Sequence, residues 1–247
     1  MKRFIKPVYL PPIVLGCGII AYIFRTFLWV SGIGNGEDAL LPVGTWPDVL
    51  SWVMVAVAVV ISALGAFTLA KKNEYLYNFP RSNLATIGMV LAALSFCITA
   101  LAELFSGGDR IGIVSAILGF PAAFCLCMLA FGRIKGRRFS MIFHGIVCLY
   151  LMVHLVSHYR LWSSYPQLQL YAFELLGIVF VMLACYHRAA FDADQGNCRA
   201  YTFFTLLAVF FCVATLPGCD NPAFFLGCGA WMYFTPCKLI QPSRKED

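Results

Sequence analysis

The chain has 247 residues, of which 61% are hydrophobic and only 12% are charged, and its mean hydropathy is +0.80. Soluble domains contain about 45–50% apolar and about 25% charged residues, so this composition excludes a soluble globular protein. The formal net charge of +6 does not indicate nucleic-acid binding, because basic residues beside membrane spans act as orientation signals. We therefore expect the lipid bilayer to be the main partner and nucleic acid to be no partner.

Long apolar runs follow one another along the whole chain. About 20 apolar residues cross a ~30 Å hydrocarbon layer as a helix, and runs that are continuous rather than alternating exclude a β-barrel. The sequence thus predicts an all-α, polytopic transmembrane helix bundle, with residues 1–247 forming a single integral membrane domain. The expected spans, about eight in number, cover residues 8–30, 49–70, 84–105, 111–132, 140–159, 166–188, 201–217 and 222–238. Whether the eighth crosses fully is open, because it reaches only ~25 Å.

Lys and Arg are distributed unevenly over this topology. Fifteen of the 18 basic residues lie at the termini and in every second loop, whereas the opposite loops hold only Arg110 and Arg160. Because basic residues collect on the cytoplasmic side, we expect both termini in the cytoplasm and the protein in the cell membrane.

Polar side chains gather around the loop between the fifth and sixth predicted spans. A loop this short makes the two spans an antiparallel hairpin, and spacing of three or four residues places side chains on one face of a helix. The polar face of the fifth span holds Tyr150, His154 and His158, and that of the sixth holds Gln167, Tyr171 and Glu174. If these faces meet, they form a polar seam in the outer leaflet.

Glu174 is the most informative of these residues. An acidic side chain at this depth costs ~2.5–3.5 kcal/mol on insertion scales, so it is expected to face the bundle interior. The predicted topology puts Arg25 and Glu103 in the same leaflet. We therefore hypothesise an outward-facing polar vestibule lined by Arg25, Glu103, Tyr150, His154, His158, Tyr171 and Glu174.

The histidines have a simpler interpretation. His154 and His158 have the i, i+4 spacing of a metal-binding pair, but no glutamate is adjacent as in H-E-x-x-H. A third ligand would have to be Glu174 or Asp220, and we interpret the pair as structural or interfacial. We expect no metal and no cofactor. The sequence has no G-x-S-x-G elbow or P-loop either, so it gives no catalytic residue and no support for an enzyme.

Two classes of function fit these observations. The first is a small transporter-like or ligand-binding membrane protein whose unidentified small-molecule ligand contacts Glu174 and His154. In that case Glu174→Gln abolishes uptake at normal expression. The alternative is a non-catalytic membrane subunit, sensor or scaffold, whose intramembrane polar residues only lock helices together. Protein partners and oligomeric state cannot be read from the sequence.

One repeated motif gives an expectation about packing. LGCG occurs at 15–18 in the first span and at 226–229 in the last. Small residues let helices approach closely in lipid, so these two spans are candidates for direct contact.

Overall fold

The computed structural model describes residues 9–33, 44–69, 78–106, 110–163 and 171–235. Within these ranges the chain forms eight helices and no strand, which confirms the all-α prediction. The helices are α1 (Leu10–Ile33), α2 (Trp46–Phe67), α4 (Asn83–Phe105), α5 (Arg110–Lys135), α6 (Met141–Trp162), α7 (Ala172–Asp192), α8 (Cys198–Ala214) and α9 (Pro222–Phe234). The first six of these are long and apolar enough to cross a membrane, whereas α8 and α9 have 17 and 13 residues.

Short polar side chains mark the start of several helices. The side chain of Ser82 accepts a hydrogen bond from the backbone N–H of Ala85, and Asn197 accepts from Arg199 and Ala200. Such caps satisfy N–H groups that lack a partner in the first turn. Most helix bounds lie within a few residues of those predicted. The expected bounds at residues 8, 70, 166 and 238 lie outside the described residues.

The outer surface of the bundle is apolar. Large hydrophobic side chains on α1, α2, α4, α5 and α6 are exposed, among them Phe67 at 71% and Phe105 at 87%. Soluble proteins rarely expose contiguous apolar surface of this extent. Length, composition and surface therefore agree with a helical membrane bundle.

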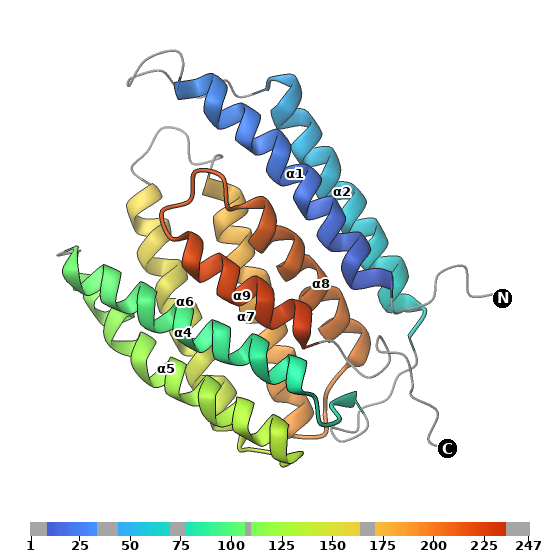
Figure 1. Cartoon of the computed structure of the whole chain (residues 1–247), viewed down its shortest axis with the longest axis vertical. Coiled ribbons are helices and arrows are strands. Elements are labelled where there is room, and N and C mark those ends of the chain that lie inside the picture. The colour runs from blue at the N-terminus through green and yellow to red at the C-terminus, as the bar shows by residue number, and fades with distance from the viewer. Residues whose placement is uncertain (1–8, 34–43, 70–77, 107–109, 164–170, 236–247) are drawn as a thin grey trace.

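Six of the helices form a closed ring of pairwise contacts. Each helix from α4 to α9 packs against the next one in the chain, and α9 returns to pack against α4. The other two described helices, α1 and α2, form a hairpin that lies along the outside of this six-helix ring and packs against α8 (Figure 1). All six ring helices send buried side chains into one continuous core, with Phe96, Phe224 and Trp231 among the largest.

Glycines set the closest approaches between helices. A Cβ added to Gly88 on α4 would lie 2.9 Å from the backbone oxygen of Ala230 on α9, so only glycine allows this contact. The two LGCG motifs do not meet in this way. Gly18 packs against the backbone of Phe210, and Gly229 packs against Cys212. Both neighbours belong to α8, so the first and last helices each pack on α8 at these glycines.

Candidate functional site

A carboxylate and two imidazoles meet at one end of the six-helix ring. Oε1 of Glu103 on α4 lies 3.1 Å from Nδ1 of His154 and 3.6 Å from Nε2 of His158, both on α6. One ligand atom from each residue lies within 4.8 Å of the others. The side chains are exposed by only 14%, 2% and 11%. We call these three residues the Glu103 triad.

The two histidines belong to a buried stripe along α6. The nearly fully buried residues of this helix recur every three or four positions, as expected for one helix face turned to a core. They are His144, Val147, Tyr150, Leu151, His154, Ser157 and His158. Oγ of Ser115 on α5 lies 3.3 Å from Nδ1 of His154, so α5 also contributes to the triad's surroundings.

Aromatic side chains pack together inside the six-helix ring, beside the triad. His154 stacks on Tyr150, and its ring centre lies 4.6 Å from that of Phe224 on α9. Phe96 of α4 contacts both Tyr150 and Phe224, with ring centres 4.8 and 5.6 Å apart. These three residues, Phe96, Tyr150 and Phe224, form what we call the aromatic layer. It packs directly beside His154, at the end of the continuous core that lies nearest the triad.

Two oxygens at this site have no hydrogen-bond partner among the described residues. Oε2 of Glu103 and the hydroxyl of Tyr150 are both buried and unpaired there. Buried polar atoms are nearly always hydrogen-bonded, and an unpaired one costs about 1–3 kcal/mol. The site therefore has capacity to bind a further polar group.

Glu174 lies in different surroundings. Both it and Arg25 on α1 are only 3% exposed, and their charges interact. Asp220, in the connection between α8 and α9, also interacts with Glu174. The guanidinium of Arg25 lies over the ring of Phe173, the residue before Glu174.

The contacts described for the predicted vestibule residues thus sort them into two groups. Tyr150, His154 and His158 face α4, α5 and α9, and Glu103 joins them. Glu174 and Arg25 form the second group, between α7 and α1. Tyr171 is the N-cap of α7, and Gln167 lies outside the described residues. The histidines therefore have Glu103 as their carboxylate neighbour, rather than the Glu174 or Asp220 considered from the sequence.

Sequence analysis missed a second buried polar cluster near the opposite end of α6. Nδ1 of His144 lies 2.8 Å from Oδ2 of Asp192 on α7, and both side chains are almost fully buried. The guanidinium of Arg188 lies 3.2 Å from the ring centre of Phe79, and that of Arg133 lies 5.2 Å from it. Both arginines are among the 15 basic residues that predict the orientation of the chain, and that prediction gave no indication that their side chains are buried. The i, i+4 spacing of Arg188 and Asp192 was the available clue.

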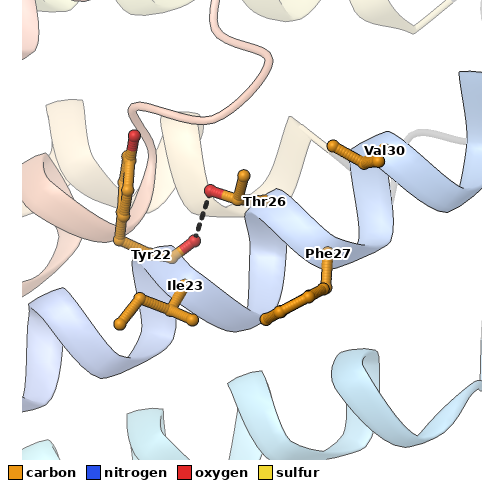
Figure 2. A pocket seen from close by; sticks show the side chains of 5 residues that line it. All are labelled: Tyr22, Ile23, Thr26, Phe27 and Val30. Atoms are coloured by element: carbon orange, nitrogen blue, oxygen red, sulfur yellow. Dashed lines mark hydrogen bonds between the residues drawn. The ribbon is translucent and has the colours of Figure 1, made fainter.

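Two surface hollows in the described part of the chain lie away from both clusters. One, of about 270 Å³, lies on the exposed face of α1 and is lined by Tyr22, Ile23, Thr26, Phe27 and Val30. Figure 2 shows these side chains and the hydrogen bond that the Thr26 hydroxyl donates to the carbonyl of Tyr22. The other, of about 300 Å³, lies between α2 and α8. Neither hollow includes a residue of the Glu103 triad.

The triad provides one carboxylate and two imidazole nitrogens around a common point. With the histidines neutral, its net charge is negative, so it suits a cation rather than an anion. Comparisons with family models, with curated proteins and with solved structures find no match to this chain.

Proposed function

We propose that the protein is a multi-pass, transporter-like protein of the cell membrane that binds a small cation at the Glu103 triad. The observation that carries the proposal is a carboxylate facing two imidazoles inside a ring of apolar helices. Ionisable groups within membrane spans are costly, and they commonly mark ion or substrate pathways.

The distribution of basic residues over the loops predicts on which side of the membrane the triad lies. With both termini in the cytoplasm, the triad lies at the outer end of the six-helix ring and the His144–Asp192 cluster lies at the inner end. His144 and His158 are 14 residues apart on α6, which corresponds to about 21 Å along the helix. One helix therefore carries polar groups over most of a membrane's thickness.

We propose that the aromatic layer blocks the ion pathway on the cytoplasmic side of the triad. Phe96, Tyr150 and Phe224 pack together directly beside His154. A cation that reaches the triad meets these rings before the inner cluster. We propose that passage requires their rearrangement, and that the described conformation holds the cation site closed toward the cytoplasm.

Reconstituted vesicles test this proposal. The purified protein is placed in liposomes that contain a fluorescent indicator, and gradients of H⁺, Na⁺, K⁺ or a divalent cation are applied in turn. At least one gradient is expected to dissipate faster than in empty liposomes. Glu103→Gln is expected to return that rate to the level of empty liposomes.

A matched variant separates transport from damage to the fold. His187 is a half-buried histidine on α7 that stacks on Phe204, away from the triad. His187→Gln is expected to retain the wild-type rate. If no cation gradient responds to the wild-type protein, or if Glu103→Gln and His187→Gln behave alike, the proposal fails.

The alternative function as a structural subunit or scaffold has one observation in its favour. The Glu103–His154 contact joins α4 to α6, two helices that are not neighbours along the ring. If the triad only joins helices, Glu103→Gln lowers the melting temperature of the detergent-solubilised protein and no cation flux is found. Unchanged stability together with lost flux favours the transporter.

A further inference from the structure

The Glu103 triad has the composition of a transition-metal site. We propose that Oε1 of Glu103, Nδ1 of His154 and Nε2 of His158 bind one divalent first-row transition-metal ion, with Zn²⁺ as the best fit. This inference rests on the proposed function, because it names the class of cation that the triad takes.

The distances between the ligand atoms agree with such an ion. Zn–N and Zn–O bonds of about 2.0–2.1 Å in a tetrahedron put neighbouring ligand atoms about 3.3 Å apart. The oxygen of Glu103 lies 3.1 Å and 3.6 Å from the two histidine nitrogens. The same three atoms all lie within 4.8 Å of one another. An ion therefore requires only small side-chain movements.

The donor types select the class of metal. Two imidazoles and one carboxylate suit Zn²⁺ and other first-row transition metals, whereas Mg²⁺ and Ca²⁺ prefer a shell made of oxygens. Three protein ligands leave a fourth position open for water. An open position is appropriate for an ion that has to enter and leave.

The surroundings supply partners for a bound ion's shell. The hydroxyl of Ser115 lies 3.3 Å from Nδ1 of His154. Because that nitrogen would bind the ion, the hydroxyl would then be available to the ion's water. Oε2 of Glu103 and the Tyr150 hydroxyl are buried without a hydrogen-bond partner among the described residues. Groups around a metal site usually orient its ligands and accept or donate hydrogen bonds to its water. These three oxygens are suited to that role.

The positions of the ligands on their helices also fit. His154 and His158 are four residues apart, which places both imidazoles on one face of α6. Their rings are 4.3 Å apart at their centres. Glu103 comes from the last turn of α4, so the ion joins two helices across the ring interior. Movement between α4 and α6 then changes the geometry of the site.

Metal binding is tested on the full chain in detergent, independently of transport. Co²⁺ is used as a probe, because its visible spectrum reports coordination geometry and a near-ultraviolet charge-transfer band reveals any thiolate ligand. One equivalent of Co²⁺ is expected to give a tetrahedral or five-coordinate spectrum without the thiolate band. Zn²⁺ is expected to displace it, and millimolar Mg²⁺ is not.

Variants assign the ligands. Glu103→Gln and His158→Gln are each expected to raise the Kd for Zn²⁺ by at least about 100-fold, since even outer-shell changes cost about 10–100-fold. His158 lies at the rim of the site, so its variant guards against a folding defect in Glu103→Gln. His187→Gln is the control and is expected to bind as the wild type does.

The outcomes separate this inference from the proposed function. Failure of the wild type to bind Co²⁺ and Zn²⁺, a thiolate band in the Co²⁺ spectrum, or equal binding in all variants overturns the metal site. Transport of H⁺ or Na⁺ without metal binding also overturns it, while leaving the proposed function intact. Metal binding without any flux in vesicles supports the metal site and contradicts the proposed transport function.

Discussion

The guanidinium carbon of Arg25 on α1 lies 4.2 Å from the centre of the Phe173 ring on α7. The next residue, Glu174, is buried and interacts with the charge of Arg25. This contact joins the outlying α1–α2 hairpin to a helix of the ring. Buried opposite charges of this kind are costly to separate, because removing one partner leaves the other uncompensated.

The Arg25–Glu174 interaction predicts a specific pattern of stability. Arg25→Met alone and Glu174→Gln alone are each expected to destabilise the protein, and the arginine change also removes the contact with the Phe173 ring. The double variant is expected to lose less than the sum, with a coupling of about 0.5–3 kcal/mol. Unfolding in detergent measures all three. Lys135→Met, at an exposed position, is the control. Strictly additive losses would contradict the interaction.

Helix contact at Gly88 predicts a matched pair of glycine variants. Gly88→Ala is expected to destabilise the protein by about 1–3 kcal/mol, because the new methyl group meets the backbone of α9. Gly145 on α6 has no atom within 4 Å of an added Cβ. Gly145→Ala is expected to be neutral, or to stabilise the helix by up to about 1 kcal/mol. Equal melting temperatures for both variants would show that α4 and α9 do not pack as described.

Cys219, in the connection between α8 and α9, predicts an unusual pH profile for alkylation. Burial raises the pKa of its thiol to about 12, and the nearby charge of Glu174 acts in the same direction. Because only the thiolate reacts, the alkylation rate is expected to rise about tenfold per pH unit from about pH 7 to pH 10 without a plateau. In the unfolded chain it should level off above about pH 8.5.

Mass spectrometry of iodoacetamide-treated protein follows Cys219 separately from the other cysteines. Glu174→Gln is expected to increase its alkylation rate at each pH, because it removes a charge that raises the thiol pKa. A rate that already levels off near pH 9 in the folded protein would contradict the burial of this thiol.

The direction of the chain in the membrane is tested with two introduced cysteines. Phe105, at the end of α4, and Arg137, between α5 and α6, are both exposed. In intact cells a membrane-impermeant maleimide is expected to label Phe105→Cys, and to label Arg137→Cys only after permeabilisation. The wild-type chain gives the background from native cysteines. The reverse pattern would invert the orientation and place the triad at the cytoplasmic end.

Hydropathy was sufficient to predict the helices, because the length and continuity of an apolar run are local properties of the sequence. The predicted topology also put Glu103 in the same leaflet as His154 and His158. The sequence could not show which helix faces which. A short loop makes α6 and α7 neighbours, but the rotation of each helix depends on packing with all of its neighbours, such as Gly119 against Ala100. The pairing of the histidines with Glu103 follows from that rotation.

Charged residues near helix ends illustrate the same limit. Arg188 has the sequence signature of an orientation signal, yet its guanidinium is buried against Phe79. A long side chain at a helix end can extend to the surface or turn inward. Which of these it does depends on the space left by residues that are distant in the sequence.

Closure of the six-helix ring has a consequence for biosynthesis. Five of its interfaces join successive helices, which can insert beside one another as the chain emerges. The sixth, between α4 and α9, joins segments that are far apart in the chain, and contacts of that kind form slowly. Phe224 of α9 packs against His154. This late step therefore completes the surroundings of the triad as well as the six-helix ring. A nascent chain without α9 has its polar groups in place but no enclosure around them.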